Sequence, residues 1–178
     1  DTAKGIKALL MTDIVHVRAN QLPPEGKVPH LAIPGTAGTG AETTAVAVLY
    51  EDGRKLSVDH PALLPDGVLL DGSLLDTLPE YHRKSCAMDA LAQGIESWWA
   101  KKATPGSRIH AERAIRGVLD NLTAYLQGDR KAQDEMLHAA YESGVAILTT
   151  RTTAAHAMSY QITKKLGAGH GHACMLTL

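Results

Sequence analysis

The first part of the chain alternates short apolar runs with polar turns. A helix is expected over residues 1–12, where apolar residues recur at helical spacing: Ala3, Ile6, Leu9 and Leu10. Apolar runs at residues 30–34, 45–50 and 68–71 are typical of short buried strands. A hairpin turn is expected at Glu51–Arg54, with the returning strand beginning at Lys55.

The pattern changes near residue 73, after which helical periodicity replaces the strand signals. Helices are expected over residues 80–102 and 131–148, with a third between them that carries an apolar stripe from Ala111 to Leu126 and a fourth that contains His156. The inward faces are expected to hold these residues: Ala87, Leu91, Ile95 and Trp98 or Trp99 on the 80–102 helix; Ala114, Ile115, Val118, Leu119 and Leu122 on the middle helix; Met136, Ala140 and Ile147 on the 131–148 helix. We therefore expect a partial α/β domain at residues 1–73 and a helical domain at residues 74–178.

Composition narrows the class of protein. Of 178 residues, 44% are apolar and 21% are charged, as in a globular domain. The net charge of −1 argues against a nucleic-acid partner, and no apolar run approaches the roughly 18 residues needed to cross a bilayer. The two cysteines, Cys86 and Cys174, are far apart and are expected to be free thiols in the cytoplasm.

Both ends of the chain look cut. The sequence begins without a methionine in an expected helix, and it stops in the apolar run ACMLTL. We expect it to be the middle of a longer protein, incomplete in its helical domain.

A segment rich in glycine and threonine, from Gly35 to Thr44, follows the first expected strand. Glycines allow a tight backbone whose N–H groups approach a phosphate or ribose, and threonine hydroxyls add donors. The spacing matches neither GxGxxG nor GxxxxGK[ST], so a plain polar turn between strands stays open as the alternative.

Three side chains form a candidate metal-ligand set: Asp89, His156 and His170. One carboxylate and two imidazoles leave coordination positions open on a divalent ion, as a catalytic site requires. Such an ion stabilises the alkoxide that develops during hydride transfer to an aldehyde. The alternatives are an arginine-paired Asp89, a core His156 and a His170 that caps a turn.

Several segments together resemble the iron-containing (group III) alcohol dehydrogenases. They are PGTAGTGAE at residues 34–42, LDGSLLDTLP at 70–79, DALAQGIE at 89–96, HAMSY at 156–160 and GHG at 169–171. They match the family's PTTAGTGSE, LDPxLxxxLP, DALxHxxE and HAxxH…PHG motifs, in that order. Glycines replace one threonine and one proline, and alanine replaces the serine.

The resemblance implies the fold class: the C-terminal part of a Rossmann-like dinucleotide-binding domain followed by an all-helical metal-binding domain, as in dehydroquinate synthase-like proteins. It implies that Asp89, His156 and His170 bind Fe²⁺ or Zn²⁺. It also implies an NAD or NADP site lined by Thr36, Thr39, Thr44, Lys55 and Leu74. The family's GGGS turn for the pyrophosphate is absent, so the chain is expected to begin just after it.

Two departures from the family pattern affect the site. Gln93 stands where most members have a further histidine, and an amide oxygen is a weak ligand, so Gln93 is an uncertain fourth position and a site without metal stays open. Tyr160 stands where many members have a histidine near the nicotinamide. Its phenol can make the same hydrogen bond, although its ordinary pKa is much higher.

The resemblance implies NAD(P)-dependent, metal-assisted, reversible reduction of a small aldehyde, with Tyr160 and His170 as catalytic residues. Some features are similar to the phosphonoacetaldehyde-reductase branch, in which His172, Arg151 or Lys101 would meet an anionic substrate. A dehydroquinate synthase-type or glycerol dehydrogenase-type enzyme and a non-catalytic fragment remain alternatives. Members of the family are often dimers or larger assemblies.

Overall fold

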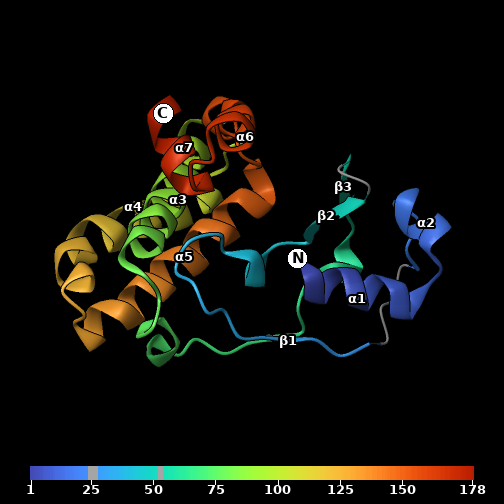
Figure 1. Ribbon diagram of the computed structural model, residues 1–178, viewed down its shortest axis with the longest axis horizontal. Helices are drawn as coiled ribbons and strands as arrows, with labels where there is room; N and C mark the ends of the chain where they lie inside the picture. The colour runs from blue at the N-terminus through green and yellow to red at the C-terminus, as the bar shows by residue number, and fades with distance from the viewer. Residues whose placement is uncertain (24–27, 52–53) are drawn as a thin grey trace. The chain divides into compact units, whose positions relative to one another are not determined.

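A computed structural model describes residues 1–23, 28–51 and 54–178 (Figure 1). The chain divides into two compact units. The N-terminal unit comprises Asp1–Ala32 and Ala41–Leu69, and the helical unit comprises Ile33–Gly40 and Leu70–Leu178. The domain boundary expected near residue 73 stays a prediction. None of the helices in the described ranges is both long enough and apolar enough to cross a membrane.

The N-terminal unit contains short helices and two two-stranded sheets. Its elements are α1 (Thr2–Met11), α2 (Ile14–Arg18), β1 (Leu31–Ala32), η1 (Ala41–Thr43), β2 (Val46–Glu51), β3 (Arg54–Asp59), η2 (Pro61–Leu63) and β4 (Gly67–Val68). Strand β1 pairs in parallel with β4, and β2 pairs antiparallel with β3 from Val46↔Asp59 to Glu51↔Arg54. The hairpin turn expected between them includes residues 52–53, which lie outside the described ranges.

Strands β1 and β4 are shorter than the apolar runs predict. The run at 30–34 ends in a proline, which lacks an N–H donor for a strand ladder. The run at 68–71 ends at Asp71, whose side chain accepts a hydrogen bond from the backbone N–H of Ser73 at 2.9 Å and caps η3 (Gly72–Leu75). A local cap thus replaces the end of the expected strand.

Helix α1 forms where periodicity predicts it, but its large apolar residues do not form its buried face. Ile6, Leu9 and Leu10 are 49–67% exposed, whereas Lys4 and Lys7 are buried. The Lys4 ammonium donates to the backbone oxygens of Ala41, Thr44 and Val46 and to the Thr44 hydroxyl. These acceptors offset the cost of burying the charge. Burial lowers the pKa of Lys4 to about 8, and the Glu42 carboxylate opposes this shift.

The helical unit consists of η3 and five helices: α3 (Glu80–Trp99), α4 (Pro105–Leu126), α5 (Arg130–Thr150), α6 (Ala154–Leu166) and α7 (His170–Thr177). Helix α4 begins with a capping box, in which the side chains of Thr104 and Ser107 each accept a bond from the other's backbone N–H. Helix α6 ends at Gly167, whose φ of 68° is the left-handed conformation that favours glycine.

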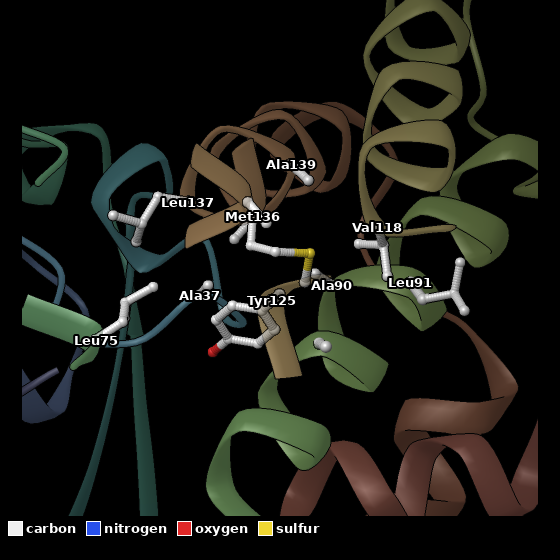
Figure 2. Packing of buried hydrophobic residues seen from close by; sticks show 12 residues of the cluster. Ala37, Leu75, Ala90, Leu91, Val118, Tyr125, Met136, Leu137 and Ala139 are labelled. Carbon is white, nitrogen blue, oxygen red and sulfur yellow. The ribbon is translucent and has the colours of Figure 1, made fainter. Parts of the chain in front are cut away.

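The core of the helical unit lies among α3, α4, α5 and the 33–40 loop. Figure 2 shows Tyr125 and Met136 within it, beside Ala37 and Ala90. Ala87, Leu91 and Val118 are buried as their spacing predicts. Trp98, Trp99 and Leu119 are 43–59% exposed, so their expected burial is wrong. The apolar stripe along a sequence shows where a helix lies, but it does not show how wide a face the neighbouring helices cover.

The 33–40 loop lies directly on the helices because of its glycines. A Cβ at Gly38 would lie 2.8 Å from the Cβ of Cys86 on α3. At Gly40, where φ is 56°, it would lie 2.6 Å from the Ala140 carbonyl oxygen on α5. These two glycines therefore permit close packing on α3 and α5, a role that the sequence did not suggest.

Candidate metal centre

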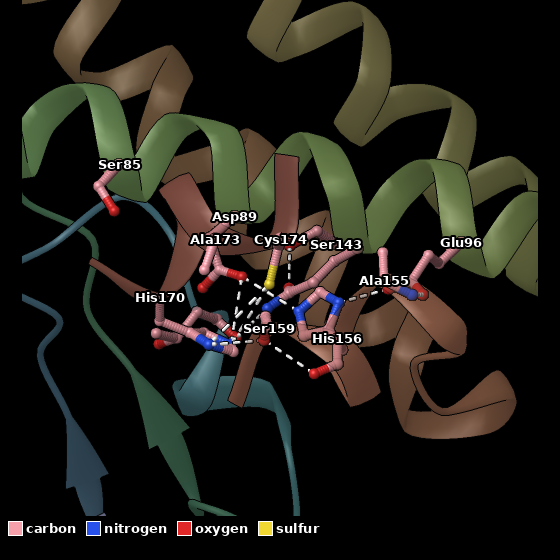
Figure 3. Close-up of polar contacts among 12 residues, drawn as sticks. Ser85, Asp89, Glu96, Ser143, Ala155, His156, Ser159, His170, Ala173 and Cys174 are labelled. Atoms are coloured by element: carbon pink, nitrogen blue, oxygen red, sulfur yellow. Dashed lines mark hydrogen bonds and ion pairs between the residues drawn. The ribbon is translucent and has the colours of Figure 1, made fainter. Parts of the chain in front are cut away.

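Four side chains converge inside the helical unit: Asp89, His156, His170 and Cys174 (Figure 3). Each offers one ligand atom, and these atoms all lie within 4.8 Å of one another. Asp89, His156 and Cys174 are buried, and His170 is half-buried. The three residues expected as ligands thus lie together, and a thiol lies with them.

The close approach of α7 to α3 brings these donors together. A Cβ at Gly171 would lie 1.9 Å from the Ser85 carbonyl oxygen and 2.8 Å from the backbone nitrogen of Asp89. Any larger residue would push α7 away from Asp89. The alternative in which His170 caps a turn is not what forms: this segment is the start of α7, with Gly169 as its N-cap and His170 as its first residue.

Glu96 orients His156. One oxygen of the fully buried Glu96 carboxylate accepts bonds from the Thr153 hydroxyl at 2.6 Å and from the backbone N–H groups of Thr153 and Ala155 at 3.0 and 2.9 Å. The other oxygen contacts Nδ1 of His156. Nε2 of His156 therefore faces Asp89 Oδ1, 3.1 Å away. This carboxylate–histidine pair is the arrangement that fixes a ligating imidazole.

The pKa of His156 is set by its burial and by the groups that it contacts. Burial alone lowers the pKa of this imidazole, but hydrogen bonds with Asp89, Cys174 and Glu96 outweigh it and raise the pKa to about 12. A divalent cation competes with the Nε2 proton for the same lone pair, so metal binding would release that proton.

His170 completes the group from the solvent side. Its Nε2 lies 3.8 Å from Asp89 Oδ1 and 3.7 Å from Cys174 Sγ. Its Nδ1 lies 3.3 Å from the hydroxyl of buried Ser159. The Tyr160 ring stacks on His170 with centroids 5.7 Å apart, and Tyr160 is 44% exposed. The two residues expected to be catalytic are therefore in contact.

Gln93 is buried one turn after Asp89, but its amide is engaged elsewhere. Its Nε2 donates to the Thr39 carbonyl oxygen at 3.3 Å, and its Oε1 accepts from the Ser143 hydroxyl at 2.8 Å. The amide holds the 33–40 loop and α5 against α3.

The residues expected to bind the cofactor are divided between the units. Thr36, Thr39 and Leu74 belong to the helical unit, and Leu74 and Thr39 are exposed. Thr44 is buried in the N-terminal unit with its hydroxyl bonded to Lys4. The side chain of Lys55 lies outside the described part of the structure.

Three residues of this centre were not assigned a role from the sequence: Glu96, Ser159 and Cys174. Glu96 appears in the DALAQGIE motif, seven residues after Asp89 and thus on the same face two turns on. Cys174 is four residues after His170, a spacing that places both on one face of a helix. That spacing is the signal that could have found it.

Comparison with known proteins matches both units to one family. Residues 1–72 match the family described as iron-containing alcohol dehydrogenase. Residues 84–178 match the description "Fe-containing alcohol dehydrogenase family, C-terminal".

Individual relatives agree with these matches. Phosphonoacetaldehyde reductase from Streptomyces viridochromogenes is 37% identical over 90% of this chain. An alcohol dehydrogenase from Thermococcus barophilus is 31% identical, also over 90% of it. The crystal structure of sulfoacetaldehyde reductase from Bifidobacterium kashiwanohense, in complex with NAD⁺, superposes with a TM-score of 0.92 over 99% of this chain at 30% identity. The chain spans 41%, 45% and 49% of the lengths of these three proteins.

Proposed function

The chain belongs to the iron-containing alcohol dehydrogenase family, and from this premise we propose that it contributes the metal-binding half of an NAD(P)-dependent enzyme that reduces a small aldehyde reversibly. The observation that supports this most directly is the convergence of Asp89, His156 and His170, with Glu96 orienting His156. A structural cation site would be closed, whereas here the His170 side chain is 37% exposed.

The donor set fits a divalent cation. Its separations of 3.1 Å between His156 Nε2 and Asp89 Oδ1 and 3.8 Å between His170 Nε2 and the same oxygen bracket the about 3.4 Å expected for tetrahedral ligands at 2.0–2.2 Å. When bound, the ion supplies Lewis-acid chemistry at a carbonyl oxygen. Asp89 and His156 hold their positions through α3 and Glu96, so these donors need little rearrangement when the ion binds.

We propose that Tyr160 meets the substrate oxygen. It lies one turn after His156 on the same face of α6, and its ring covers His170. A phenol in that place can donate a hydrogen bond to the oxygen on which charge develops.

The N-terminal unit is proposed to be the C-terminal part of a Rossmann-like nucleotide domain, within a dehydroquinate synthase-like fold. The cofactor would be NAD or NADP, which supplies the hydride. Thr36, Thr39, Thr44, Lys55 and Leu74 are proposed to line its site, because they fall in the motifs that carry the resemblance. A reducing compartment such as the cytoplasm suits the chain, since Cys86 and Cys174 are both free thiols.

An anionic aldehyde is the proposed substrate class. Two of the relatives are named for phosphonoacetaldehyde and sulfoacetaldehyde, each a small aldehyde with an oxyanion. Among the expected anion-binding residues, Lys101 follows the end of α3, and Trp99 at that end is already about 15 Å along the axis from Asp89. The other two expected residues are Arg151, at the junction of α5 and α6, and His172, which lies in α7 two residues after His170.

Turnover by the full-length protein tests the proposal. Oxidation of NADH and NADPH would be followed with acetaldehyde, phosphonoacetaldehyde and sulfoacetaldehyde, together with metal content. We expect Asp89→Asn to lower turnover at least about 100-fold and to reduce bound metal, while the matched exposed control Asp120→Asn changes neither. Unchanged metal content and turnover in Asp89→Asn would overturn the assignment, and cofactor cycling without net NADH consumption would favour a synthase.

A further inference from the structure

We propose that Cys174 is a fourth metal ligand, so that the ion is held by one carboxylate, two imidazoles and one thiolate, and the carbonyl oxygen of the proposed function would enter as a fifth ligand. The inference rests on the metal site of the proposed function and concerns which residue supplies its remaining ligand. Gln93, at the position expected for a further ligand, has both ends of its amide in hydrogen bonds to Ser143 and Thr39.

The position of the sulfur fits coordination. Cys174 Sγ lies 3.7 Å from His170 Nε2 and 3.9 Å from Nδ1 of the same ring, so joint coordination requires this half-buried ring to turn its Nε2 toward the ion. Two ligands of one tetrahedral ion, with sulfur at about 2.3 Å and nitrogen at about 2.0–2.1 Å from it, are separated by about 3.5 Å. The same Nε2 atom is 3.8 Å from Asp89 Oδ1. The ligand atoms of all four residues lie within 4.8 Å of one another, close enough for one cation to bring them together.

The fold holds this thiol in place beside the other donors. Cys174 is fully buried, one helical turn after His170, so α7 presents both toward Asp89. Cys86, the other cysteine, is half-buried and lies against Gly38 of the 33–40 loop instead. The molecule therefore contains a matched internal control for any thiol measurement.

Coordination converts the thiol to a thiolate, and its proton passes to solvent as the metal–sulfur bond forms. Thiolate is a soft donor that favours zinc over harder cations, whereas a set of carboxylate and imidazoles alone discriminates less. The expected consequence is a site with a stronger preference for Zn²⁺ than the same site without sulfur.

Cobalt substitution tests the ligand directly. The full-length protein would be stripped of metal, loaded with Co²⁺ and examined by absorption spectroscopy beside Cys174→Ser and Cys86→Ser. A thiolate ligand gives a sulfur-to-cobalt charge-transfer band in the near ultraviolet. We expect the band in the wild type and in Cys86→Ser, and its loss in Cys174→Ser with the visible cobalt bands retained. Zinc affinity in Cys174→Ser should fall at least about tenfold, the lower bound for losing even an outer-shell partner.

X-ray absorption at the zinc edge of the loaded wild type needs no variant, so the proposal stays testable if Cys174→Ser does not fold. One sulfur at about 2.3 Å is expected beside nitrogen and oxygen neighbours at about 2.0–2.2 Å. A shell of nitrogen and oxygen only would overturn the sulfur ligand while leaving the metal site of the proposed function intact. Failure of the wild type to bind Co²⁺ or Zn²⁺ would overturn both.

Discussion

Glu96→Gln should weaken metal binding although it replaces none of the proposed ligands. The amide is nearly isosteric with the carboxylate, but only one of its two ends accepts hydrogen bonds. The oxygen that now accepts three bonds, two from Thr153 and one from Ala155, must remain an acceptor. Reversing the amide would leave three donors without a partner at a cost of about 1–3 kcal/mol each.

That fixed orientation points the new NH₂ group at Nδ1 of His156. Metal binding requires a neutral ring, and because Nδ1 then has to accept, the one remaining ring proton would lie on Nε2, the atom that faces Asp89. A protonated Nε2 cannot coordinate a cation. We expect zinc affinity to fall by about 10–100-fold, or about 1.4–2.7 kcal/mol. The loss of charge from three hydrogen bonds should lower the free energy of unfolding by up to about 3 kcal/mol.

Competition with a chromophoric chelator measures the affinity, and urea denaturation measures the stability. The ring ¹⁵N shifts of His156 report the tautomer. Glu112→Gln is the matched control, since Glu112 is exposed on α4 and pairs with Arg116. Wild-type affinity in Glu96→Gln, or a His156 tautomer with the proton still on Nδ1, would refute the reasoning.

Two further substitutions test the supporting structure. Gly40→Ala should lower the free energy of unfolding by about 2–4 kcal/mol, because it combines a left-handed backbone with a Cβ 2.6 Å from the Ala140 carbonyl oxygen. Gly35→Ala, where nothing lies within 4 Å, should change it by less than about 0.5 kcal/mol, and equal effects in urea denaturation would contradict this account. Folding lowers the pKa of Lys4 from 10.5 to about 8, so between these pH values the unfolded chain binds more protons than the folded one. Lys4 therefore destabilises the fold below about pH 8 and loses this effect as the pH rises to 10.5. The stability of the wild type relative to Lys4→Met should therefore rise between about pH 8 and 10.5, and parallel pH profiles would contradict it.

Helical periodicity located α1, α3, α4 and α5 because each has repeated apolar spacing, and side-chain caps also mark the starts of α4 and α5. It did not identify the covered face where long polar side chains find internal acceptors. On α1, Lys4 reaches the oxygens of the 41–46 segment, and so the lysines, not Ile6 or Leu10, are buried. Hydrophobicity alone cannot anticipate this, since it depends on oxygens that lie about forty residues away.

The candidate site was largely predictable because its motifs carry Asp89, His156 and His170. Cys174 was missed for a local reason: glycines at 169 and 171 suggested a turn, whereas they permit close packing of a helix on α3. Once α7 begins at His170, the i, i+4 relation to Cys174 follows.

The source of the fourth donor decides from which side a substrate can arrive. A donor at residue 93 would come from α3, but that space is filled by the amide bonds to Ser143 and Thr39. Asp89 and His156 side chains are each 5% exposed, and that of His170 is 37% exposed. With Cys174 buried beneath His170, the solvent-facing side of the donor group is that of His170 and Tyr160. Under the proposed function, an incoming carbonyl oxygen would meet the phenol of Tyr160 as it reaches the ligands. Of the two departures from the family pattern, the tyrosine, and not Gln93, is therefore the one expected to act on the substrate.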